Sequence, residues 1–254
     1  DHIDANTNKC CFPVDWITHK DLQEGIKKYI ENILERVYLY QYAYNDLMHW
    51  CKDHHLYAAY DAGFINLDKQ YLTIGINGLN QAAEYLGMEC NNNIYYKTFC
   101  RLIFSTIKEQ NKKHKTKTAQ FNTEQVPAES ASVKLYNRDK ADGYWIPTDT
   151  NLYASYIFKP NDTHISILDK ITLHSSEFAA DELDGGSACH LNLSEHLSQK
   201  QYEYLLKFMA KVGCKYVTFN IPNCECDECH FIAKQPFSKC PKCGSTHVSL
   251  WDRI

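Results

Sequence analysis

Residues 226–244 read CDECHFIAKQPFSKCPKCG, and this stretch decides the fold of the C-terminal part of the chain. It contains two Cys-x2-Cys pairs separated by ten residues, namely Cys226 with Cys229 and Cys240 with Cys243. Such spacing brings four thiolates around one tetrahedral ion, as in zinc ribbons. Four thiolates leave no coordination position open, so the sequence predicts a structural zinc ion in a domain of residues 220–254.

Two details of this region bear on the ligand set. Pro241 and Gly244 shape the second Cys-x2-Cys turn in the manner that zinc ribbons require. Cys224 is an alternative ligand to Cys226, because it also lies close before Cys229. A zinc ribbon alone does not specify a function.

Composition narrows the class of protein. The chain has 254 residues, of which 44% are hydrophobic, and a formal net charge of −4, which is typical of a folded globular protein and gives no global basic field for nucleic acid. The sequence lacks the roughly 18 consecutive apolar residues of a membrane span, and it does not open as a secretory signal does. We therefore expect a cytoplasmic protein that keeps its twelve cysteines reduced.

Hydrophobic periodicity upstream of the cysteines predicts mixed helices and strands, and therefore an α/β fold. Apolar residues at three- and four-residue steps predict helices over 21–55, 95–113 and 198–213. Tyr71 to Gly87 predicts an extended segment, a glycine turn and a further helix, and residues 216–220 predict a strand. The remaining chain is predicted to be rich in turns, with extended pieces at 131–136 and 152–158 and a loop at 184–187.

Three segments in this upstream region carry a family resemblance. They read YLTIGINGL (71–79), FNTEQVPAES (121–130) and LDGGSACHLNL (183–193). Together with the cysteine-rich C-terminal region, and in this order, they resemble the catalytic subunit of anaerobic (class III) ribonucleoside triphosphate reductase, a glycyl-radical enzyme. The resemblance implies the second portion of a ten-stranded β/α barrel over residues 1–219, followed by the zinc ribbon at 220–254.

The same resemblance implies an activity, the replacement of the ribose 2′-hydroxyl of a ribonucleoside triphosphate by hydrogen. In the family a glycyl radical oxidises a cysteine to a thiyl, and Cys10 and Cys11 are the candidates here because they lie in a loop ahead of the long helix. Two small buried residues, or another redox pair, is the alternative interpretation of these cysteines. The family's radical glycine is expected after Arg253-Ile254, so the chain as given is not expected to turn over alone.

Polar residues in the resembling segments are candidate substrate contacts. Glu124 could assist departure of the 2′-hydroxyl by proton transfer, Asn122 could hold ribose hydroxyls, and Glu129 is the alternative acid. Gly185 and Gly186 could let backbone amides approach phosphates. The alternative for each is a structural role, as a loop residue that caps backbone groups or as an ordinary turn.

The resemblance also implies partners. These are a radical-SAM activase with an iron–sulfur cluster, formate or a thiol redoxin as reductant, dNTP and ATP effectors, and a second copy of the chain in a homodimer.

The remaining cysteines are expected to be packing residues, with Cys189 lining the barrel; the others are Cys51, Cys90, Cys100 and Cys214.

Two rival functions come from other classes. A nucleic-acid-binding protein could use its zinc ribbon together with the basic run at 112–117, although the acidic net charge weighs against this. A non-catalytic regulatory protein is the second rival.

Overall fold

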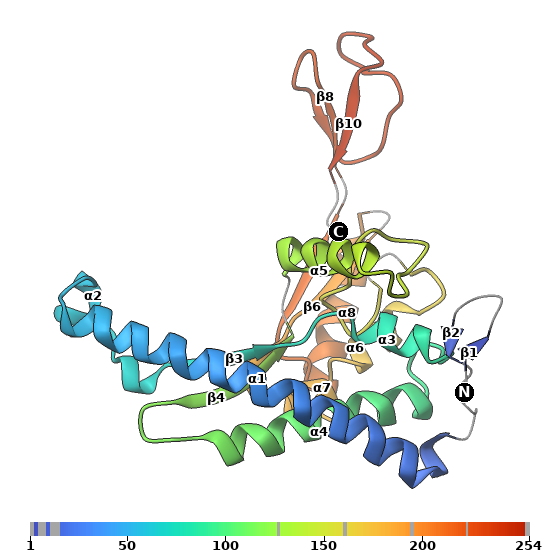
Figure 1. The fold of residues 1–254 in the computed structure, drawn as a ribbon. Coiled ribbons are helices and arrows are strands. Elements are labelled where there is room, and N and C mark those ends of the chain that lie inside the picture. Colours follow the sequence, from blue (N-terminus) through green and yellow to red (C-terminus); the bar gives the residue numbers. More distant parts are fainter. Residues whose placement is uncertain are drawn as a thin grey trace.

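The computed structural model describes residues 3–4, 9–10, 16–125, 128–159, 162–193, 196–221 and 223–251. A body of helices and parallel strands carries a small module of antiparallel strands, which projects from it (Figure 1). Among the described residues, no helix combines the length and apolar character needed to cross a membrane.

Two long helices, α1 (Lys20–Asp53) and α4 (Ile94–His114), confirm two of the predicted helices and pack side by side (Figure 1). A buried polar chain ties them to the sheet. The Tyr38 hydroxyl donates to Asn111 Oδ1 at 2.6 Å, and Asn111 Nδ2 donates to Thr123 Oγ1 at 2.9 Å. Because buried polar groups require partners, this chain fixes the position of the strand that carries Thr123.

The body contains two parallel sheets. β3 (Tyr71–Gly75), β4 (Gln120–Gln125) and β5 (Gly186–Ser187) lie in that order, and β6 (Cys189–Asn192) pairs with β7 (Val217–Asn220). Parallel strands require crossover connections, and helices supply them here, which confirms the predicted α/β class.

Shorter elements complete the body. α8 (Gln199–Val212) confirms the last predicted helix, with a capping box between Ser198 and Gln201 at its start and left-handed Gly213 at its end. The others are β1 (Ile3–Asp4), β2 (Lys9–Cys10), η1 (Trp16–Thr18), α2 (Ala58–Asp61), η2 (Leu67–Lys69), α3 (Leu79–Tyr85), α6 (Ile167–Thr172) and α7 (Ala179–Glu182).

Three local predictions are wrong. Residues 131–136 belong to a helix, α5 (Glu129–Ala141), which exposes Val133 and Leu135 and buries Ser132 and Tyr136, one helical turn apart. The alternation of apolar and polar residues therefore misled the strand prediction. Residues 152–158 form no strand although several are buried, and Gly186–Ser187 forms β5 rather than only a loop.

The projecting module consists of β8 (Asn223–Cys226), β9 (Ile232–Ala233) and β10 (Val248–Trp251) in the order β10-β8-β9. Antiparallel pairing places Val248 opposite Cys226. The sheet therefore carries Cys226, the first of the four cysteines, at the end of its central strand.

Candidate active face and four-cysteine group

The two faces of β4 differ in character. Phe121 joins the core beneath α1 and α4, and Thr123 bonds to Asn111 of α4, so these alternate residues face the helices. Asn122 and Glu124 point to the opposite face, where both are half-buried. The structure thus brings two predicted substrate contacts to one face of one strand.

Glu124 lies between glycines on both neighbouring strands. The parallel register pairs it with Gly75 of β3 and with Gly186 of β5. Neither glycine has any other group within 4 Å of the position that a Cβ atom would occupy. The Glu124 carboxylate therefore has no side chain beside it on either neighbouring strand, which leaves space for a ligand.

Gly185 packs closely against β4. A Cβ atom there would lie 2.8 Å from both Asn122 Nδ2 and the carbonyl oxygen of Thr123. The Gly185 amide donates to that same carbonyl at 2.8 Å, and the neighbouring Asp184 carboxylate accepts from the Thr123 amide at 2.8 Å. Close packing of the loop against β4 therefore requires glycine at 185, whereas Gly186, with φ +127, borders open space.

A cavity of about 570 Å³ lies near the N-terminal end of α5. Asn77 Nδ2 donates to Ser132 Oγ at 3.1 Å and to Ser155 Oγ at 3.2 Å, and both serines line the cavity. Gln81 also lines it, and its buried Nε2 has no hydrogen-bond partner among the described residues. This group was not predicted, because its members come from three segments that are distant along the chain.

The remaining predicted catalytic residues are placed only in part. Cys10 lies in β2, which pairs with β1, and Cys11 lies outside the described residues. Glu129 is the first residue of α5, but its side chain is outside the described part of the structure. The candidacy of all three residues therefore stays a prediction.

A buried histidine, His174, forms a hydrogen bond with the last residue of β5. His174 Nδ1 lies 2.6 Å from Ser187 Oγ, and Ser187 pairs with Gln125 beside the Glu124–Gly186 pair. Complete burial lowers the pKa of His174 to about 3, so its ring is neutral at neutral pH. The neutral ring can keep its bond to Ser187, and thereby the position of β5, over a wide pH range.

This histidine predicts acid sensitivity. Its pKa is about 3 when folded and near 6.5 when unfolded, so its stabilising effect is complete above pH 6.5 and is lost as the pH falls toward 3. At pH 4.5 we expect a loss of about 3 kcal/mol in the free energy of unfolding. Urea unfolding at pH 7.5 and 4.5 measures this: the pH dependence should weaken in His174→Gln and persist in a control substitution at exposed His196. An unchanged pH dependence in His174→Gln would contradict the assignment.

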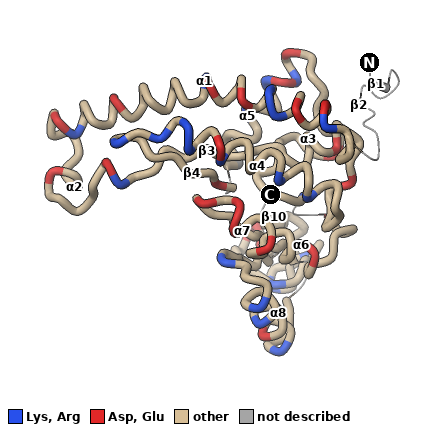
Figure 2. The backbone as a smooth tube through the Cα atoms, turned by 90° about the horizontal axis from the view of Figure 1, so that it is seen from below, with Lys and Arg blue, Asp and Glu red and all other residues tan. Residues whose placement is uncertain are grey.

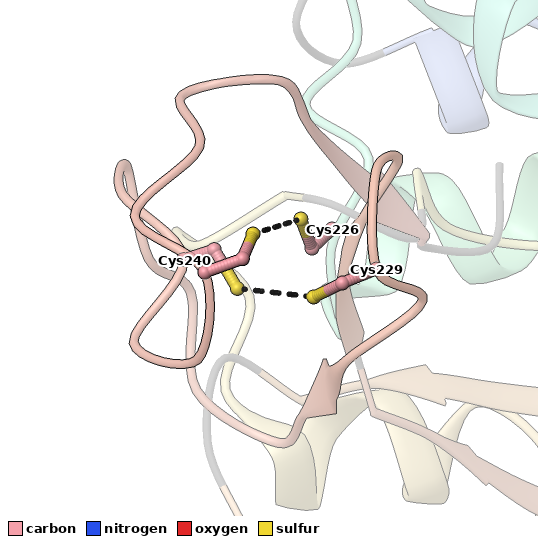
Figure 3. Close-up of side chains that lie close together, drawn as sticks. Cys226, Cys229 and Cys240 are labelled. Atoms are coloured by element: carbon pink, nitrogen blue, oxygen red, sulfur yellow. Dashed lines mark hydrogen bonds between the residues drawn. The ribbon is translucent and has the colours of Figure 1, made fainter.

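The four predicted zinc ligands come together in the projecting module (Figure 3). Their sulfur atoms all lie within 4.8 Å of one another, with Cys226 and Cys243 at 3.5 Å and Cys229 and Cys240 at 3.6 Å. Sulfurs bound to one tetrahedral zinc at 2.3 Å lie about 3.8 Å apart. The group could therefore hold a metal ion such as zinc.

Each cysteine pair lies in its own backbone turn, and the two turns have the same hydrogen-bond pattern. The amides of His230 and Gly244 donate to the carbonyls of Cys226 and Cys240, each at 2.9 Å, and both residues have positive φ, 53° and 80°. Gly244 fits the turn that the sequence predicted. His230 adopts the same left-handed conformation without being glycine, which the sequence did not indicate.

Cys224 does not join the group. Its thiol is buried and donates to the carbonyl of Phe237 at 3.4 Å, and its sulfur is not among the four that lie within 4.8 Å of one another. For Cys240, burial raises the pKa, but the amides of Cys243 and Lys242 outweigh it and lower the pKa to about 6.

The basic run at 112–117 starts in the last turn of α4. Lys113 Nζ and His114 Nε2 lie 3.6 Å and 3.5 Å from Glu35 of α1. Figure 2 shows acidic residues among the basic ones along the backbone. This pairing favours the interpretation of the run as a solvated helix end, where cations also complement the helix dipole.

Fold and site together define an α/β protein with a polar face on its parallel sheet and a four-cysteine group that could bind a metal. The sequence model of one family, described as anaerobic ribonucleoside-triphosphate reductase, matches residues 16–254. The chain belongs to this family. No curated protein sequence matches it significantly.

Solved structures support the same fold. An anaerobic ribonucleotide reductase aligns with a TM-score of 0.74 and 23% identity, covering 91% of this chain and 37% of its own. The enzyme from Thermotoga maritima with MES in the active site gives 0.75 and 23%, covering 91% and 39%. Its complex with dATP and CTP gives 0.74 and 23%, covering 91% and 38%. The chain thus spans less than two fifths of the length of these relatives.

Proposed function

We propose that this chain supplies part of the substrate-binding barrel of an anaerobic ribonucleoside-triphosphate reductase, which converts ribonucleoside triphosphates to 2′-deoxyribonucleoside triphosphates. The observation that carries the proposal is the half-buried Glu124 carboxylate between Gly75 and Gly186, within a chain of this family. An acid with open space on both sides can approach a ribose ring and exchange a proton with it.

Each residue of this face has a role in the proposal. Glu124 gives a proton to the departing 2′-hydroxyl, and Asn122, two residues before it on the same face, orients the ribose hydroxyls. Gly186 leaves space for the substrate. Gly185 packs against β4 and so fixes the position of the loop that carries Gly186. Glu129 is the alternative acid. The family's glycyl radical, where present, supplies the oxidising equivalent for a cysteine, with Cys10 and Cys11 as candidates.

The cavity beside α5 suits the phosphates. Backbone amides at a helix N-terminus attract anions, and the unpaired Gln81 amide adds a donor; Lys159 also lines the cavity, as do the carboxylates of Asp149 and Asp162. Asn77 links this cavity to the active face, because Ile76 beside it donates its amide to the Glu124 carbonyl at 3.1 Å. A nucleotide with its ribose at Glu124 and its phosphates toward α5 fits this arrangement.

The proposal extends to the complete enzyme. Residues 1–219 form the second portion of a ten-stranded barrel, and residues 220–254 form a zinc ribbon in which the four cysteines hold a structural ion. The zinc ribbon positions the glycine-bearing loop of the family. Activation by a radical-SAM activase, reduction by formate or a thiol redoxin, control by dNTP and ATP effectors, and assembly as a homodimer in the cytoplasm belong to the same proposal.

Nucleotide binding by this chain tests the proposal. We expect saturable binding of a ribonucleoside triphosphate by the metal-loaded chain in a calorimetric or NMR titration, and weaker binding by Asn122→Ala. Gln120→Ala is the matched control, because Gln120 lies on the same face at the other end of β4. Equal affinities of Asn122→Ala and the parent chain, or no binding by either, would contradict the proposed site.

A further inference from the structure

Two cysteines outside both sites lie where the two-stranded sheet of β6 and β7 begins. Cys189 is the first residue of β6 and is fully buried in the main core, while Cys214 follows the C-cap of α8 and is half-buried. The Tyr216 carbonyl accepts from the Cys189 amide at 3.0 Å and from the Cys214 thiol at 3.8 Å. One carbonyl thus joins the backbone of one cysteine to the sulfur of the other.

The two side chains also interact directly. The two thiols are near enough for each to affect the other, which lowers the pKa of Cys214 and raises that of Cys189. The buried ammonium of Lys170 acts on Cys189 in the opposite sense and favours its thiolate. Cys214 is therefore the more readily ionised and the more accessible thiol, and Cys189 is a buried partner behind it.

We propose that Cys189 and Cys214 form a dithiol site that small disulfides oxidise to an intramolecular disulfide. The Cys214 thiolate attacks the small disulfide, forms a mixed disulfide and releases one small thiolate. Cys189 then loses its proton to solvent and attacks the Cys214 sulfur, which releases the second small thiolate. Two protein thiols are oxidised and one small disulfide is reduced to two thiols, so the electrons balance.

The cross-link would join two elements that the fold already holds together. β6 pairs with β7 from Cys189 to Asn192, and Cys214 lies in the turn that leads from α8 into β7. The bond therefore closes the loop that contains α8 without requiring a new contact between distant parts. Because loop closure constrains the unfolded chain, the oxidised protein should unfold at a higher temperature than the reduced protein.

Peptide mapping tests the proposal on the metal-loaded chain. The reduced protein is incubated with hydroxyethyl disulfide, alkylated, and digested with trypsin. Cys189 and Cys214 are each the only cysteine of their tryptic peptides, which span residues 171–200 and 212–215. We expect these two peptides joined and two hydrogens lighter than their sum, and their separation by dithiothreitol.

Matched variants make the outcome specific. Cys214→Ser and Cys189→Ala should abolish the joined peptide, whereas Cys100→Ser, at a core cysteine that is equally buried, should keep it. A stable mixed disulfide on Cys214 with Cys189 still open to alkylation after unfolding would overturn the proposal. So would equal yields of the joined peptide from the folded chain and from the chain oxidised in urea.

Discussion

Removal of the metal ion is expected to unfold the module of residues 223–251 and to leave the body folded. Within these described residues the only buried side chains are cysteines, namely Cys224, Cys226 and Cys240. The module therefore has almost no apolar core, and an ion held by four thiolates must supply its stability. Apparent binding free energies of about 10–16 kcal/mol in zinc-finger peptides are sufficient for this.

Two cysteines two residues apart give a sharp comparison. Cys226→Ser should lose the ion and the dispersed NMR signals of β8 to β10, including the Trp251 indole, which donates to Glu225 at 3.0 Å. Cys224→Ser should retain both, because the Cys224 thiol bonds to a backbone carbonyl outside the group. Metal content and the amide spectrum measure the difference. Metal loss in Cys224→Ser, or a folded module after chelation, would contradict this account.

The cysteine group was predictable from sequence because ligand spacing is local. Two Cys-x2-Cys pairs leave few geometries, and the structure brings the same four sulfurs within 4.8 Å. The competing ligand Cys224 could not be excluded by spacing, since Cys224 and Cys226 lie on the same face of β8 and only the folded chain gives the Cys224 thiol another partner, the Phe237 carbonyl. The left-handed His230 was equally hidden, because no residue-type preference demands it.

Long helices were predicted well for a similar reason. The periodicity of α1 extends over 34 residues, so single exceptions do not obscure it. Helix α5 was missed because its buried stripe consists of Ser132 and Tyr136, while Val133 and Leu135 remain exposed. Burial of a serine depends on partners such as Asn77, which lies 55 residues away and cannot be inferred from a short window.

The face of β4 that carries Asn122 and Glu124 was predictable only in part. The sequence indicated Asn122 and Glu124 through the resemblance, but strand alternation alone puts them on one face only once β4 is known to be a strand. Register is what places Gly75 and Gly186 on either side of Glu124. Pairing between strands that are distant in sequence is a tertiary property, and for the same reason the link from His174 to Ser187 was not foreseen.

Substitution of Glu124 by glutamine is expected to cause the largest loss of activity of any change on this face. Glutamine keeps the size of the side chain and can still hydrogen-bond, but it cannot give up a proton. A positioned general acid typically contributes about 10²–10⁴-fold to rate, so a loss of this size is expected. Binding of the ribonucleoside triphosphate should change far less, because in the proposal the substrate is held mainly by Asn122 and by the cavity beside α5.

The most direct test of the central claim is the anaerobic formation of deoxyribonucleoside triphosphate by the activated reductase polypeptide that carries this sequence. Glu124→Gln and the control Gln120→Ala are compared with the parent enzyme at equal metal content and equal radical content. The account predicts product from the parent and from Gln120→Ala, and a rate lower by about 10²–10⁴-fold from Glu124→Gln. A Glu124→Gln enzyme that forms product at the parental rate would contradict it.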